Sequence, residues 1–194
     1  DISDLAGSGG EIVFDYWMGD DVDASIVIDQ TGMLYVAAEI DHATARGAEV
    51  GQFVKLDPSR RGDPLVWSID VPGSGGADGG IWATPALSDS VVYVLTNPGE
   101  ILAVDVDDGT VVWRDDVGPH AWSSPVIIDD TLVVSIDCES NSGFRAYDIT
   151  NERQPIEKWE SRVTGGCIES TPAVWGGRLF VGSRDGYFYA LGAK

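Results

Sequence analysis

Three tryptophans recur at an equal interval in this chain of 194 residues. Trp67, Trp113 and Trp159 are 46 residues apart, counting from 67 to 113 and from 113 to 159. An interval of roughly 40–50 residues is the period of the units that build β-propellers. The interval therefore predicts one structural unit repeated along the chain, with the same side chain doing the same packing task in each copy.

Three further patterns recur along the chain in step with the tryptophans. They are a small hydroxyl residue and a proline before an apolar run, a β-branched strand, and a strand that ends in an acid. The copies are Thr84–Leu87, Ser124–Ile127 and Thr171–Val174; Leu34–Val36, Val92–Val94, Leu132–Val134 and Leu179–Val181; and Phe53–Asp57, Ile101–Asp105 and Phe144–Asp148. Turns rich in Gly, Asn, Asp and Pro separate the patterns, and no segment shows sustained helical periodicity. Each period therefore predicts four short strands, a, b, c and d, with the tryptophan on d.

The predicted fold class is all-β, a β-propeller of four-stranded antiparallel blades that forms a single domain over residues 1–194. We expect an N-terminal closing d strand within 1–22, blades at 23–70, 79–117 and 119–162, and a fourth blade at 165–194 that lacks its d strand. Gly10–Phe14 matches Gly109–Trp113, with Phe14 at the tryptophan position, which is why a closing strand is predicted. The alternatives are a closed four-blade ring, half of an eight-bladed ring completed by a second copy, and a fragment of a longer propeller.

The repeated prolines and tryptophans are given structural roles. Pro85, Pro125 and Pro172 are predicted to lie on strand a, the innermost strand of each blade, whose inner edge has no partner. Proline donates no hydrogen bond to a sheet, so it is tolerated at such an edge. Trp67, Trp113 and Trp159 are predicted to be plugs between adjacent sheets, and stacking on a planar cofactor or a sugar is the alternative.

The segment Ala103–Trp113 resembles the tryptophan-docking motif of the PQQ-like, quinoprotein-type repeat family, to which the BamB-like scaffolds belong. In that motif an alanine and an acid or amide precede a turn with glycine, and tryptophan follows the glycine by four residues, as Trp113 follows Gly109. The resemblance covers nearly the whole chain and is close at Ser170–Gly192. It implies a propeller whose tryptophans pack between blades. The other copies have longer c–d turns, and the turn at Thr150–Pro155 has no glycine.

The resemblance implies a fold and does not imply a bound quinone. Quinoprotein dehydrogenases of the family hold PQQ with two adjacent cysteines, a stacking tryptophan and a calcium ion, and this sequence has no adjacent cysteines. No catalytic, cofactor-binding or metal-binding residue is predicted. PQQ and calcium are expected only under the alternative that the chain is a fragment of a quinone-dependent dehydrogenase.

The two cysteines are predicted to meet between neighbouring blades. Cys138 follows strand b of the third repeat and Cys167 precedes strand a of the fourth, so both fall on the same rim. A disulfide here would close a loop of about 30 residues and stabilise the fold by about 3 kcal/mol. It would indicate an extracellular, periplasmic or cell-envelope location, and two separate thiols are the alternative. We expect a mature chain or an excised piece of a longer one, because its start shows no signal-peptide pattern.

The net charge of −20 excludes two classes of partner. Thirty-two acidic residues against 12 basic ones repel nucleic-acid phosphates and anionic lipid headgroups. No apolar stretch is long enough to span a bilayer. A protein partner, or self-association that completes the propeller ring, is predicted instead.

The leading functional hypothesis is a non-catalytic scaffold that binds a protein or ligand through its rim loops or channel mouth. The best candidate for a partner contact is the longest predicted loop, Glu39–Gly51, which carries His42 and Arg46. The dehydrogenase fragment is the second hypothesis. A hydrolase or lyase that uses Glu169 with Asp137 is the third.

Overall fold

The computed structural model describes residues 11–74, 78–136, 138 and 141–193, and within them it is built of small antiparallel sheets. The first sheet holds β1 (Val27–Ile28), β2 (Leu34–Ala37), β3 (Phe53–Leu56) and β4 (Leu65–Ile69). The second holds β5 (Ala86–Leu87), β6 (Val91–Leu95), β7 (Glu100–Asp105) and β8 (Val111–Asp116). The third holds β9 (Val126–Ile128), β10 (Thr131–Ile136), β11 (Ser142–Asp148) and β12 (Ile156–Thr164), and the last holds β13 (Ala173–Trp175), β14 (Arg178–Gly182) and β15 (Phe188–Gly192).

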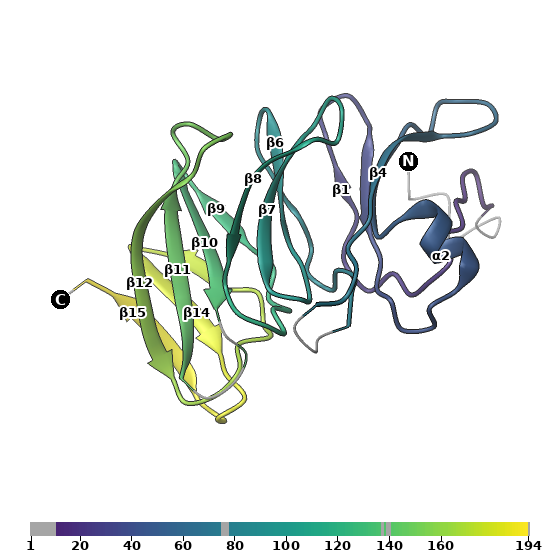
Figure 1. Cartoon of the computed structure of the whole chain (residues 1–194). Helices are drawn as coiled ribbons and strands as arrows, with labels where there is room; N and C mark the ends of the chain where they lie inside the picture. The colour runs from purple at the N-terminus through teal and green to yellow at the C-terminus, as the bar shows by residue number, and fades with distance from the viewer. Residues whose placement is uncertain (1–10, 75–77, 137, 139–140, 194) are drawn as a thin grey trace.

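Each sheet follows chain order from its first strand to its last, as a propeller blade does. The blades fan along an arc, with blade 1 and blade 4 at opposite ends (Figure 1). The predicted all-β propeller class is confirmed. Within the described residues the arc is open, and blade 4 has three strands.

One predicted loop contains a helix. Within Glu39–Gly51, residues Ala45–Val50 form α2, where Thr44 accepts a hydrogen bond from the Gly47 N–H at 2.9 Å and Gly51 ends the helix at φ 84°. Six residues are too few to show helical periodicity in a sequence, so the loop prediction was wrong at this point. No helix in the described part of the chain has the length and apolar character that crossing a membrane requires.

The N-terminal segment covers the outer face of blade 1. Phe14, Tyr16 and Met18 pack there, together with Val50 of α2. Arg46 holds the segment in place, because its guanidinium donates to the Trp17 carbonyl at 3.2 Å and to the Tyr16 hydroxyl at 3.3 Å. Residues 11–22 form no strand with the described chain, so the expected closing d strand is not formed within this copy; residues 1–10 lie outside the described part.

Hydrogen bonds between inner loops join one blade to the next. The Ser25 N–H donates to Thr84 Oγ1 at 3.0 Å, and the Thr84 N–H donates to Ser124 Oγ at 3.0 Å. Ser123 Oγ donates to the Ser170 carbonyl at 2.9 Å. The hydroxyl of the hydroxyl–proline pattern therefore accepts a hydrogen bond from a backbone N–H of the preceding blade. The proline comes next, immediately before the first residue of β5, β9 and β13. At this place its missing N–H removes no hydrogen bond from the sheet.

Large side chains fill the space between sheets. Trp67 is buried between blades 1 and 2, and its indole N–H donates to the Val106 carbonyl at 3.1 Å. Trp113 packs between blades 2 and 3, with its ring edge-to-face on Tyr147 at 5.1 Å. Trp159 differs, because it is 43% exposed at the junction of blades 3 and 4.

The acids that end the c strands shape the c–d turns. One carboxylate oxygen each of Asp57, Asp105 and Asp148 accepts the backbone N–H two residues later, at 2.8–3.0 Å. The third turn, which lacks glycine, is fixed differently. The Glu152 carboxylate there accepts hydrogen bonds from the Ser88 and Ser90 hydroxyls and from the Ser90 N–H of blade 2.

We expect Gly109→Ala to destabilise the fold more than Gly186→Ala. A Cβ at Gly109 would lie 2.8 Å from the Trp67 ring, whereas a Cβ at Gly186 meets nothing within 4 Å. Both residues have positive φ, so both variants carry a similar backbone cost of about 1 kcal/mol, and only Gly109→Ala adds about 1–3 kcal/mol of overpacking. Urea denaturation of both variants measures the difference. Equal midpoints would contradict the docking of Trp67 on this turn.

Candidate functional site

We call one edge of the propeller the inner rim. There, in each blade, the loop before the innermost strand meets the end of the blade's second strand. Corresponding backbone bonds hold it in three blades: the Glu39, Asn97 and Arg184 N–H groups donate to the carbonyls of Asp21, Gly80 and Cys167 at 2.9–3.0 Å. Three residues before each repeat proline, the same rim carries Trp82, Trp122 and Glu169. Blade 1 has Asp23 at this position.

Two tryptophans stack at the centre of the inner rim. The rings of Trp82 and Trp122 are 4.8 Å apart with 27° between their planes, and both side chains are half-buried. The Trp122 indole N–H donates to Asn97 Oδ1 at 2.6 Å, and the Asn97 side-chain amide donates to the Asp78 carbonyl at 2.9 Å. The ring of His120 lies 5.8 Å from that of Trp122. The pair is a rigid aromatic surface that remains open to solvent.

A carboxyl pair occupies the inner rim of blade 1. Glu39 is 8% exposed and shares a hydrogen bond with Asp23. Burial, followed by the negative charge of Asp23, raises the pKa of Glu39 to about 7. The pair therefore gains or loses a proton near neutral pH.

At the inner rim of blade 4, Glu169 forms an ion pair with Arg184 at 3.0 Å. The predicted disulfide between Cys138 and Cys167 is present beside it and joins blade 3 to blade 4. Asp137, which the hydrolase hypothesis pairs with Glu169, lies outside the described residues. Glu169 is thus engaged by a cation on its own blade, which does not favour a role as a catalytic acid or base.

Two groups of described side chains come close enough to hold a metal ion. In the first, Cys138, Cys167 and Glu169, the thiols are used in the disulfide. In the second, Asp20, Asp21 and His42, one Asp20 oxygen already accepts the backbone N–H groups of Asp21, Asp41 and His42. Burial opposes ionisation of Asp20, but these bonds outweigh it and lower its pKa to about 2. Asp20 therefore fixes the chain around His42.

The predicted partner residues His42 and Arg46 make their described contacts with blade 1 and the N-terminal segment. The His42 side chain is 59% exposed and bonds to Asp20 at 3.2 Å. Arg46 is occupied by the N-terminal segment and by Glu49, with which it forms an ion pair at 3.2 Å. A partner contact at His42 stays a prediction.

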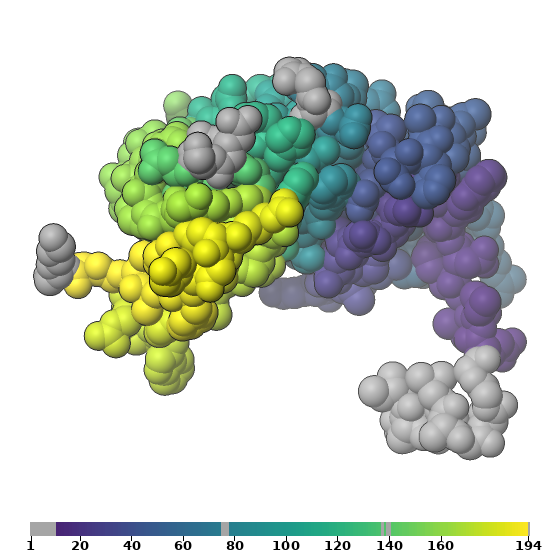
Figure 2. Space-filling model, turned by 90° about the horizontal axis from the view of Figure 1, so that it is seen from below, coloured from purple at the N-terminus to yellow at the C-terminus, as the bar shows by residue number. Residues whose placement is uncertain are grey.

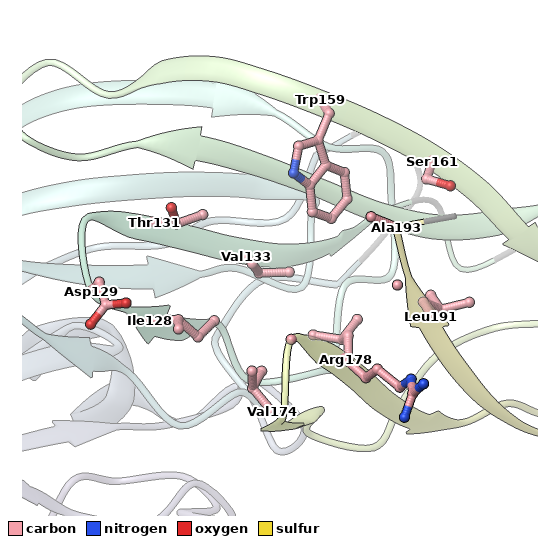
Figure 3. A pocket seen from close by; sticks show the side chains of 13 residues that line it. Ile128, Asp129, Thr131, Val133, Trp159, Ser161, Val174, Arg178, Leu191 and Ala193 are labelled. Atoms are coloured by element: carbon pink, nitrogen blue, oxygen red, sulfur yellow. The ribbon is translucent and has the colours of Figure 1, made fainter.

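A cavity of about 560 Å³ opens between blades 3 and 4. Trp159 lies over it, and Ile128, Val133, Val174, Leu191 and Ala193 form much of its wall (Figure 3). At the junction of blades 1 and 2 the corresponding indole, Trp67, rests on Gly109 of the next c–d turn. Within the described residues, which end at 193, no c–d turn of blade 4 covers the Trp159 ring.

Sequence reasoning did not select Trp82 and Trp122. A signal was present, because both precede a repeat proline by three residues, the same offset as Glu169. Their stacking, in contrast, depends on how blades 2 and 3 are joined.

Sheets that fan about an axis, with indoles docked between them, define a PQQ-like β-propeller. The family model described as outer membrane protein assembly factor BamB matches residues 47–194. That match spans well over half of the sequence, and the chain belongs to this family. Among curated proteins, none matches the sequence significantly.

Solved structures with the same fold include a BamB protein, quinohemoprotein alcohol dehydrogenases and computationally designed proteins. BamB from Moraxella catarrhalis is 20% identical with a TM-score of 0.64, over 88% of this chain and 50% of that one. The computationally designed Ika4 protein is 11% identical with a TM-score of 0.68, over 96% and 99%. A quinohemoprotein alcohol dehydrogenase from Pseudomonas putida HK5 is 15% identical with a TM-score of 0.64, over 87% and 29%. The chain thus spans half of the BamB structure and under a third of the dehydrogenase.

We expect Glu39→Gln to flatten part of the pH dependence of stability. A folded-state pKa of about 7, above the ordinary 4.5, means that the Glu39 contribution is present below pH 4.5 and is lost as pH rises through 7. The variant should therefore be more stable than the wild type above pH 7, by about 1–3 kcal/mol. Denaturation midpoints from pH 4 to 9 measure this. Glu49→Gln, an exposed carboxylate on α2, is the control, and a matching profile for both variants would refute the assignment.

Proposed function

We propose that the chain is a non-catalytic scaffold of the cell envelope that binds a protein partner through the inner rim. The observation that carries the proposal is the stacked, half-buried pair Trp82 and Trp122. Tryptophan is enriched among the residues that dominate protein interfaces, and a rigid pair loses little conformational entropy on binding. The repeat tryptophan Trp67, in contrast, is buried between blades and unavailable to a partner.

Charge indicates which side chains of the partner the inner rim accepts. Carboxylates lie at the same rim position as the tryptophans, Asp23 on blade 1 and Glu169 on blade 4. An indole face attracts cations. The net charge of −20 adds long-range attraction for a basic partner. We therefore propose that the partner inserts arginine or lysine side chains at the inner rim.

The cell-envelope location is proposed from two facts. The disulfide between Cys138 and Cys167 is of a kind that persists in oxidising compartments. The family model that the chain matches is described as an outer membrane protein assembly factor. Together they favour a periplasmic or otherwise extracytoplasmic protein.

The rim residues fit PQQ with calcium poorly. The cysteines of the disulfide are 29 residues apart and come from different blades, whereas the family's quinone site uses adjacent cysteines. The Asn97 side-chain amide, which contacts the stacked rings, is already bonded to the Trp122 indole and to the Asp78 carbonyl. One face of each indole is covered by the other indole. We derive no reaction step through a quinone from these residues.

Reconstitution with PQQ and calcium tests the dehydrogenase alternative directly. We expect no change in the absorbance of the quinone and no dye reduction with alcohols, because the Asn97 amide and the Glu169 carboxylate are bonded to other side chains and the disulfide joins cysteines of different blades. The protein from Pseudomonas putida named above, reconstituted in the same way, is the positive control. A bound quinone that turns over an alcohol would replace the scaffold proposal.

Binding at the inner rim is tested with a capped tetra-arginine peptide as the probe. We expect the indole N–H signals of Trp82 and Trp122 to shift in ¹H–¹⁵N spectra, and a capped tetraglutamate peptide to leave them in place. Trp122→Ala should weaken binding about tenfold. Trp17→Ala, which removes an indole that is 70% exposed elsewhere, should not. Equal loss in both variants, or shifts spread over all indoles, would contradict a site at this rim.

A further inference from the structure

A lysine stands on blade 1 where the next two blades have alanine. Ala103 of blade 2 and Ala146 of blade 3 are the c-strand residues that pair with the d-strand tryptophans. In blade 1 the residue that pairs with Trp67 is Lys55. The packing that the blades share needs only a methyl group at this position, so it does not explain a long charged side chain.

The ammonium group of Lys55 is buried without an anion. Lys55 is 8% exposed, and its Nζ donates to the Val106 carbonyl at 2.7 Å and lies 5.4 Å from the centre of the Tyr35 ring. Among the described residues no carboxylate forms an ion pair with it. A buried charge without a counter-charge is costly, and one carbonyl engages only one of its three N–H groups. The group can therefore still donate to a ligand that carries a negative charge.

Lys55 lies in the wall of a crevice of about 590 Å³ between blades 1 and 2. The crevice is lined by the turn after β1, the turn after β5 and the turn that joins β7 to β8. This last turn lies at the top of Figure 1, and the inner rim lies at the opposite end of the sheets, the end that faces the viewer in Figure 2. The crevice is therefore separate from the stacked tryptophans.

The corresponding space between blades 2 and 3 is filled by a carboxylate of the chain itself. Glu152 of the third c–d turn reaches the turn after β5, where its carboxylate accepts hydrogen bonds from Ser88 and Ser90. Counted from the acid that ends the c strand, the same place in the second c–d turn is Gly109. A Cβ there would lie 2.8 Å from the Trp67 ring, so this turn cannot carry a glutamate. The crevice beside the buried ammonium thus has no inserted side chain like that of its neighbour among the described residues.

Acids surround the mouth of the crevice. Asp89 and Asp107 line it and are exposed. Asp29 lines it too, but its carboxylate already accepts the Thr31 N–H at 2.8 Å. These acids and the net charge of −20 repel a simple anion, and the buried ammonium repels a simple cation. A ligand that carries charges of both signs, with the positive in excess, is attracted by both parts of the crevice.

We propose that the crevice between blades 1 and 2 binds a free basic amino acid such as lysine. The α-carboxylate of the ligand accepts a hydrogen bond from Lys55 Nζ, and its two cationic groups face Asp89 and Asp107. One carboxylate and two cations match the one buried ammonium and the two exposed acids. The volume of the crevice is that of a small-molecule site. A neutral sugar fits less well, because it leaves the buried ammonium without an anion.

The first experiment titrates the protein with L-lysine and follows its indole N–H signals in ¹H–¹⁵N spectra. The Trp67 indole donates to the same Val106 carbonyl as Lys55, so its signal should shift and saturate. L-lysinamide, which has no carboxylate, should bind about tenfold more weakly or worse. A shift confined to Trp82 and Trp122 would place the ligand at the inner rim. That result, no shift at all, or equal binding of the two compounds overturns the proposal.

The second experiment removes the buried ammonium. Lys55→Met keeps the length of the side chain and places an apolar group in a buried position, so the variant should fold. Its dissociation constant for L-lysine should rise about tenfold or more, and its response to the tetra-arginine peptide at the inner rim should not change. Lys158→Met, which changes an exposed lysine of β12, is the matched control and should bind L-lysine as the wild type does. Unchanged binding in Lys55→Met overturns the proposal.

A third experiment leaves the buried side chains intact. Asp107→Asn removes one exposed acid at the mouth and should weaken L-lysine binding about two- to fivefold. Asp15→Asn, which removes an exposed acid of the N-terminal segment, is the control. Equal effects of the two variants contradict the assignment of the mouth. D-glucose is titrated in parallel, and a saturable shift of the Trp67 signal that Lys55→Met abolishes would replace the amino acid with a sugar.

Discussion

The contact between one blade's large ring and the next blade's turn is the interaction on which the rest of the structure depends. A four-stranded sheet with strands of two to nine residues buries little surface within itself, so it needs a neighbour on each face. Trp67 supplies that neighbour contact to blade 2 through its ring, and its indole N–H is satisfied by the Val106 carbonyl. On the axial side, the hydroxyls of Thr84 and Ser124 join the inner loops. Together these contacts set the spacing of successive sheets, and the inner rim takes its geometry from that spacing.

The repeat was readable from the sequence because it is a property of spacing. Equal intervals between Trp67, Trp113 and Trp159 and the recurring hydroxyl–proline step require only that each blade solve the same packing problem. The helix α2 was not readable, because six residues held by Thr44 and by packing on blade 1 leave no periodic trace. Even identical spacing did not give identical environments. Trp67 is 8% exposed and Trp159 is 43% exposed. The ring is buried only where a turn of the neighbouring blade packs against it, as the turn at Gly109 does against Trp67.

The candidate site, like the fold, has features that the sequence predicts and features that it does not. The positions of Trp82 and Trp122 could be read from their offset to the prolines, and the cysteine pairing could be read from the placement of both residues on one rim. The stacking of the two indoles, the engagement of Asn97 and the raised pKa of Glu39 could not be read. Each depends on side chains from different blades, or on how deeply a carboxyl is buried, and neither is encoded in a local pattern. The inner rim therefore combines positions that the repeat dictates with chemistry that departs from it, which is where function is expected in a repeat protein.

The contacts between blades have a direction, and that direction has a consequence for synthesis on the ribosome. Trp67 of blade 1 needs the turn around Gly109 of blade 2, and the Ser25 N–H needs the Thr84 hydroxyl, so each blade is completed by the one that follows it in the chain. A nascent blade emerges with its indole uncovered and is sealed only once roughly fifty more residues have left the exit tunnel. The growing chain thus carries a single transient apolar surface that moves toward the C-terminus with elongation, and a chaperone would have one advancing target to protect.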